Sequence, residues 1–98
     1  MANAYEIAKA GGRHKGLVRR FAKEREASIL KSIRSLQAMI LEYQDKINNP
    51  MKYLEPNVSL FHRQDLVTRY WLEEIENFEQ QIDVLTGILQ ERNNEQSS

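Results

Sequence analysis

The chain has 98 residues, of which 41% are hydrophobic and 29% are charged, and it contains no cysteine. This length and composition indicate one mostly helical domain, and the lack of cysteine excludes disulfides, thiolate metal ligands and cysteine nucleophiles. No apolar run reaches the roughly 18 residues that a membrane-spanning helix needs. Residues 1–12 contain no continuous apolar stretch of the signal-peptide type.

The net charge is zero, but the charges are unevenly distributed. Residues 1–49 carry ten Lys/Arg and five Asp/Glu, whereas residues 50–98 carry four and nine. We expect the opposite charges to flank the contact between the two halves and favour their antiparallel pairing. The alternative is a basic surface that serves an acidic partner.

Residues 1–27 form the N-terminal region, which is basic and contains two short helical patterns. Asn3 is a suitable N-cap for the first pattern, and Gly11 can end it in the left-handed conformation. The second pattern starts at His14, and we expect a bend near Ala27 and Ser28, where the apolar spacing is interrupted. The alternative is an uninterrupted helix from about residue 14.

Two heptad patterns follow, each with alternating spacings of four and three residues. The first consists of Ile29, Ile33, Leu36, Ile40, Tyr43 and Ile47, and the second of Trp71, Ile75, Phe78, Ile82, Leu85 and Leu89. Each pattern places its apolar residues on one narrow face of a helix, which is typical of a helix packed along another helix. We therefore predict long helices over residues 28–48 and 60–92.

The connector, residues 49–59, contains both prolines, and Ser59 is a suitable N-cap for the second long helix. Residues 93–98 are polar and are predicted to be a frayed tail. Gly87 lies inside the second helix, and we expect it to let another backbone come close. The predicted fold is all-α: an antiparallel hairpin of two long helices, with the N-terminal segment packed as a third helix. A second copy could supply the same cover, which would give a homodimer.

The segment from Gly11 to Gly16 is the least ordinary part of the sequence. Glycines can leave backbone amides free to bind an anion, and basic side chains surround them here. The spacing matches neither a phosphate-binding P-loop nor a dinucleotide fingerprint. The predicted anion- or phosphate-binding residues are Gly11, Gly12, Arg13, Lys15, Gly16, Arg19 and Arg20. The alternative is a loop between helices with solvated charges.

His14 and His62 are the only histidines. An imidazole titrates near neutral pH, so the two could act as a general acid and base of the metal-free ribonuclease type if they converge. We name both as catalytic candidates. The alternative for His62 is a place in the cap of the second long helix.

The remaining patterns give weaker indications. No spacing typical of a metal site or of a cofactor is present, so we predict neither. Residues 9–34 carry nine Lys/Arg and two Glu, a net charge of +7, which favours binding to the phosphate backbone of nucleic acid. The aromatic residues at heptad spacing are typical of a core rather than of a ligand cage.

Several segments together resemble a small helical domain found at the C-terminal ends of bacterial polymorphic toxins of the Rhs and filamentous-haemagglutinin types. They are EIAKAGGRHKG (6–16), KSIRSL (31–36), DKINNP (45–50) and residues 71–89. The resemblance covers roughly residues 6–90, and its most specific part is the Gly-Gly-basic-His-x-Gly segment. Position 43 departs from the pattern, since it holds Tyr43 where a histidine is expected.

The resemblance implies an antibacterial effector domain that is delivered from another cell, acts in the bacterial cytoplasm and has a cognate immunity protein as partner. It also places His14 and its neighbours among the functional residues. The chain begins at its own methionine without a delivery region, which would suit an excised domain, an orphan module or a non-toxic relative. The leading hypothesis is thus a toxin-like domain acting through its basic N-terminal site on nucleic acid. The alternative is a non-enzymatic helical module for protein–protein interaction.

Overall fold

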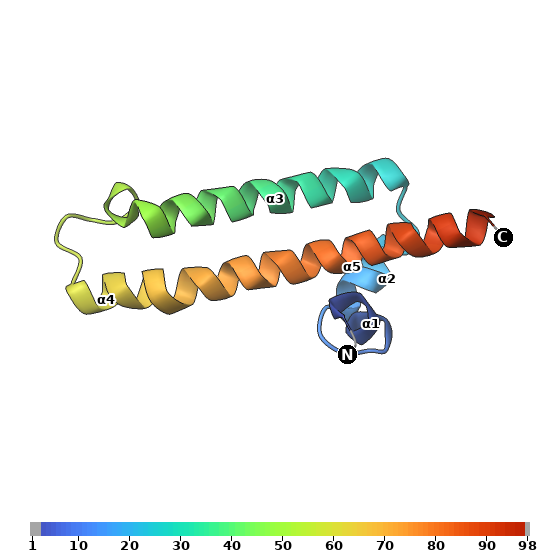
Figure 1. Cartoon of the computed structure of the whole chain (residues 1–98), viewed down its shortest axis with the longest axis horizontal. Helices are drawn as coiled ribbons and strands as arrows, with labels where there is room; N and C mark the ends of the chain where they lie inside the picture. The colour runs from blue at the N-terminus through green and yellow to red at the C-terminus, as the bar shows by residue number, and fades with distance from the viewer. Residues whose placement is uncertain (1–2, 98) are drawn as a thin grey trace.

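The computed structural model describes residues 3–97, and these contain helices and no strand. The all-α class predicted from the sequence is therefore confirmed. In chain order the elements are α1 (Ala4–Lys9), α2 (Lys15–Phe21), α3 (Glu26–Asn48), the 3₁₀ turn η1 (Pro50–Lys52), α4 (Leu60–Asp65), the π-helical turn η2 (Leu66–Tyr70) and α5 (Trp71–Ser97). Two long rods, α3 and the α4–η2–α5 run, lie side by side in opposite directions, and α1 and α2 pack against α5 (Figure 1).

Local side chains and glycines account for the ends of these helices. Asn3 Oδ1 accepts a hydrogen bond from the Glu6 amide at 2.9 Å, and Ser59 Oγ accepts one from the His62 amide at 3.1 Å, so both predicted N-caps are present. Gly11 has a φ of +99° and ends α1 in the left-handed conformation, as the sequence predicts.

The structure differs from the sequence-based expectations at three places. The bend lies at residues 22–25 instead of near Ala27 and Ser28, because Arg25 is the extended N-cap of α3 and the Ser28 amide bonds to the Arg25 carbonyl. Residues 93–97 of the tail expected to fray are helical, and Ser98 lies outside the described residues. Arg92, just before this tail, donates to the carbonyls of Phe21 and Ala22 at 2.9 Å each. Gly87 faces the aromatic ring of Tyr5, a side chain, where we expected a backbone.

A π-helical turn that the sequence analysis did not predict interrupts the second rod. Here the Trp71 amide bonds to the Leu66 carbonyl, five residues back, and the Thr68 hydroxyl donates to the Gln64 carbonyl at 2.7 Å. The apolar residues Val67, Trp71 and Ile75 follow at two successive spacings of four, and the wider turn keeps them on one side of the rod.

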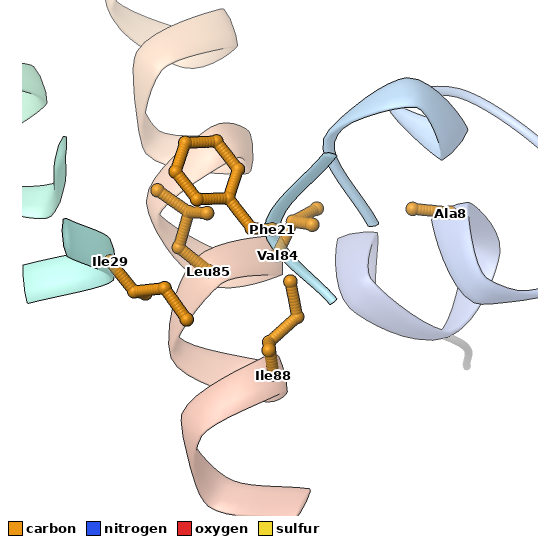
Figure 2. Packing of buried hydrophobic residues seen from close by; sticks show 6 residues of the cluster. All are labelled: Ala8, Phe21, Ile29, Val84, Leu85 and Ile88. Atoms are coloured by element: carbon orange, nitrogen blue, oxygen red, sulfur yellow. The ribbon is translucent and has the colours of Figure 1, made fainter. Parts of the chain in front are cut away.

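The main core lies at one end of the molecule, where α1, α2, α3 and α5 meet. Figure 2 shows its buried side chains: Ala8, Phe21, Ile29, Val84, Leu85 and Ile88. At the other end only two rods pack together, and there Trp71 and Ile75 are buried while Ile40, Tyr43 and Phe78 are half-exposed. The resulting molecule is elongated, with extents of 58 × 26 × 19 Å.

Candidate functional site

The glycine-rich segment is built as a helix C-terminus. The Gly11 amide donates to the Ala8 carbonyl at 3.1 Å and the Gly12 amide to the Ile7 carbonyl at 2.9 Å, which together form a Schellman motif. Both amides are therefore used within the loop. Gly16 lies in the first turn of α2 with open space around it. The geometry gives Gly11 and Gly12 a role in ending α1, and their two bonded amides do not point at an anion.

His14 precedes α2 and lies against α5. Its Nε2 is 3.1 Å from Gln80 Oε1 and 3.3 Å from Arg13 Nε. The Arg13 N–H can donate to Nε2 only when that nitrogen is unprotonated, whereas the Gln80 oxygen accepts from it only when it is protonated. The tautomer of His14 therefore selects one of these two contacts.

Carboxylates lie close to this pair. Arg13 Nη2 donates to Asn77 Oδ1 at 3.3 Å, and a hollow of about 180 Å³ beside it is lined by Arg13, Glu73, Glu76, Asn77 and Gln80. An anion bound at Arg13 would meet these carboxylates, and like charges repel. This side of α5 is a poor place for a polyanion.

His62 lies at the opposite end of the molecule, exposed in the first turn of α4 (Figure 1). Eighteen positions of the second rod separate it from Gln80, the partner of His14, which is roughly 27 Å at the helical rise of about 1.5 Å per residue. The structure does not bring the two histidines together, so they cannot serve one reacting group as acid and base.

Tyr43 is part of the contact between the long rods. Its ring meets that of Phe78 edge-on, with centroids 5.2 Å apart, and Lys46 Nζ lies 4.1 Å from the Tyr43 centroid. Burial, together with the nearby Glu74 carboxylate, raises the pKa of Tyr43. Phe78 and Gln80 are two positions apart on α5, or roughly 200° around the helix, so position 43 and His14 lie on opposite sides of α5.

The basic residues of α2 and of the start of α3 are exposed and unpaired. We call residues 15–34 the basic segment; its cations are Lys15, Arg19, Arg20, Lys23, Arg25, Lys31 and Arg34. Within residues 3–97 the ion pairs join Lys9 to Glu91, Lys52 to Asp45, and Arg69 to Asp65 and Glu73, so no cation of the basic segment has a carboxylate partner. Two of these pairs join the two halves of the chain: Lys9–Glu91, which links α1 to α5, and Lys52–Asp45, in which the cation comes from the second half.

A groove opens beside the basic segment, where α2, α3 and α5 meet. Its volume is about 300 Å³. Its lining residues are Leu17, Arg20 and Phe21 of α2, Lys31, Ser32, Ser35 and Leu36 of α3, and Gln81 and Leu85 of α5. The groove shares Arg20 with the predicted anion-binding set. The α3 residues were missed, although their positions i, i+1, i+4 and i+5 place them on one helix face and could have indicated it.

Two further observations bear on the kind of site. Across residues 3–97, no three His, Asp or Glu side chains gather in a way that could hold a metal ion. The same residues form no helix with both the length and the apolar character needed to cross a membrane.

Comparison with protein-family models, with curated proteins and with solved structures found no match to this chain.

Proposed function

We propose that this chain is a bacterial effector domain of the polymorphic-toxin type that binds nucleic acid through its basic segment. In this proposal the fold is an antiparallel helical hairpin with the N-terminal helices docked as a third element. The domain acts in the cytoplasm of a recipient cell, and an immunity protein protects the producer. The proposal rests on the resemblance described above and on the charge distribution at α2 and α3.

The single observation that carries the nucleic-acid part is the set of unpaired cations in the basic segment. Seven Lys/Arg side chains, all exposed, are accompanied in residues 15–34 only by the carboxylates of Glu24 and Glu26. Unpaired cations at this density attract the phosphates of a nucleic-acid backbone and release its condensed counterions on binding. We include no bond-breaking step, because the two histidines lie at opposite ends of the molecule.

The binding proposal is tested by salt titration with RNA and single-stranded DNA. The variant Arg19→Gln/Lys23→Gln, called the α2 charge variant, removes one charge of α2 and one of the turn that follows it. Each phosphate that this variant no longer neutralises should reduce the slope of log K against log salt by about 0.7 on a single strand. The matched control, Lys52→Gln/Arg69→Gln, removes two charges at the opposite end and should leave the slope unchanged. Equal slopes for wild type and the α2 variant would refute the role of the basic segment.

The effector proposal is tested by expression in bacteria. The wild-type domain should arrest growth, and the α2 charge variant should relieve the arrest while retaining its helical circular-dichroism spectrum. The variant His14→Ala tests the functional role that the resemblance implies for His14. Normal growth in cells that accumulate folded wild-type protein would contradict the toxin proposal.

A second candidate function is a non-enzymatic interaction module, and the exposed apolar side chains of the two-rod end favour it. Phe61 is 86% exposed and Leu41 is 67% exposed, and neither lies near the main core. This function predicts a concentration-dependent dimer in sedimentation velocity that Phe61→Ser/Leu41→Gln weakens and that the α2 charge variant does not change. A monomer over the whole concentration range would exclude the homodimer.

A further inference from the structure

The groove between α2, α3 and α5 has an apolar floor. Phe21 and Leu85 are buried at its base, with 5% and 1% of their surface exposed, and Leu17 and Leu36 line its half-exposed walls. The helix α2 has only seven residues and packs against α5. The floor suits a flat or aliphatic group that gains from leaving water.

The rim of the groove is polar and contains no carboxylate. Arg20 reaches it from α2, with its guanidinium carbon 5.0 Å from the centroid of the Phe21 ring, and Lys31 reaches it from α3. Ser32, Ser35 and Gln81 complete the rim, and none of their side chains makes a hydrogen bond to another residue within 3–97. Two cations from different helices thus stand over an apolar floor, beside hydroxyl and amide groups whose hydrogen bonds are free for a ligand.

These groups match one class of ligand. A phosphate can bind between two cations, an apolar floor favours a planar ring, and hydroxyl and amide groups can bond to donors and acceptors on the ring edge. A nucleotide of a single strand carries all three features. A base within a duplex does not, because its faces are stacked on its neighbours. The volume is near the lower end of the range of about 300–1,000 Å³ for ligand pockets, which suits one nucleotide better than a length of peptide.

We propose that this groove binds one unstacked base of single-stranded nucleic acid, with the adjoining phosphate held between Arg20 and Lys31. This inference rests on the proposed function and adds to it, since charge alone gives no preference between a single strand and any other polyanion. The domain therefore prefers strands that carry bases over backbones that lack them.

The test uses fluorescence anisotropy with two labelled oligonucleotides of equal length, one with bases and one made of abasic residues. The wild type should bind the strand with bases about fivefold more tightly or better, the lower end for one stacked base. Ser35→Leu fills the groove from its α3 wall and should abolish this preference. The control Gln37→Leu adds the same side chain to α3 at an exposed position roughly 200° away and should retain it.

The outcomes separate the two proposals. Equal affinity of the wild type for both strands would overturn the base-binding groove and leave polyanion binding standing. No binding of either strand would overturn both. Retention of the preference in Ser35→Leu, with its circular-dichroism spectrum unchanged, would place the base elsewhere and overturn the groove. Competition by an acidic peptide against the strand with bases, but not against the abasic strand, would assign the groove to a protein partner and overturn the proposal.

Discussion

His14 is the single non-glycine residue among residues 3–97 with a positive φ, at 71°. This left-handed conformation costs an L-residue about 1–2 kcal/mol relative to the right-handed one. The contact between its Nε2 and Gln80 helps to hold the residue there, and the backbone must turn at this point because α2 starts at the next residue.

We predict that His14→Gly is more stable than His14→Ala by about 1 kcal/mol, or roughly 4–8 °C in melting temperature. Both variants lack the imidazole, so the difference isolates the backbone. The control Ala38→Gly, at an exposed position inside α3, should instead destabilise the protein by about 1 kcal/mol. A His14→Gly variant no more stable than His14→Ala would show that the turn does not need the left-handed conformation.

Asp45 joins the end of α3 to the connector. Its carboxylate accepts hydrogen bonds from the Tyr53 hydroxyl, from Lys52 Nζ at 3.0 Å and from Asn49 Nδ2 at 2.8 Å. These three bonds, with that from Tyr53 foremost, lower the pKa of Asp45 from 3.8 to about 2. The same contact raises the pKa of Tyr53 and that of Lys52.

The pH dependence of this contact has a definite sign. A carboxyl whose pKa is lowered on folding adds stability above its unfolded pKa, near 3.8, and loses that contribution as the pH falls towards about 2. We therefore expect wild type to melt above Asp45→Asn at neutral pH and the two melting curves to converge over this acid range. Asp65→Asn is a useful second variant, since Arg69 lowers the pKa of Asp65 at a separate site. A constant gap between wild type and Asp45→Asn down to pH 2 would show that Asp45 titrates normally.

At the scale of elements, α1 docks on one stripe of α5. Asp83 accepts from the Tyr5 amide at 3.2 Å, Gly87 faces the Tyr5 ring, and Glu91 accepts from the Tyr5 hydroxyl and from Lys9 Nζ. These α5 residues are spaced by four, so they share a helix face. Because Gly87 has no side chain, the Tyr5 ring can lie directly against α5 at this position, and a Cβ there would overlap the ring.

We predict that Gly87→Ala destabilises the protein, because a clash of about 1–3 kcal/mol outweighs a helix-propensity gain of about 1 kcal/mol. In a Tyr5→Ala background the ring is absent, and the penalty should fall by at least about 1 kcal/mol. Chemical denaturation of the four proteins of this double-mutant cycle measures the coupling. Gly16→Ala, in open space in α2, should stabilise the protein by up to about 1 kcal/mol. If Gly87→Ala stabilises equally, α1 does not dock through Tyr5.

The helix class, the caps and the buried faces could be predicted from the sequence because they depend on neighbours a few residues apart. Spacing identifies Ile29 and Leu85 as core residues, and Asn3 and Ser59 cap through local bonds. The docking of α1 could not be predicted, because it depends on residues about 80 positions away.

The sequence alone could not distinguish the two roles of the glycine-rich segment, for a chemical reason. Glycines that end a helix and glycines that expose amides to an anion look alike in sequence. Only the bonds of Gly11 and Gly12 to the carbonyls of α1 distinguish the two roles. The groove was missed because its residues come from three helices, although Arg20 was among the predicted anion-binding residues.

At the scale of the whole molecule, the packing is concentrated at one end. The radius of gyration is 16.7 Å, against about 13 Å for a compact chain of 100 residues. Six side chains are buried where four helices meet, whereas the two-rod end buries Trp71 and Ile75. Local stability follows the density of buried apolar contacts, so the two ends should open independently to some extent.

We predict a gradient of amide hydrogen exchange along both rods. Amides at residues 40–47 and 62–70 should exchange on the order of tenfold faster or more than those at residues 29–36 and 81–88, equal to about 1.4 kcal/mol of local stability. Exchange measured by NMR at neutral pH gives these rates residue by residue. Uniform protection along both rods would mean that the two-rod end is covered in solution, for which self-association is the first explanation to examine.

The docking of α1 also has a consequence for how the protein is made. During synthesis Asp83, Gly87 and Glu91 follow their partners Tyr5 and Lys9 by about 80 residues, so α1 cannot dock until the intervening chain has been made. Arg92, which holds the carbonyl end of α2, emerges equally late. We therefore expect fragments that stop before Asp83 to leave α1 and α2 untethered in their NMR spectra.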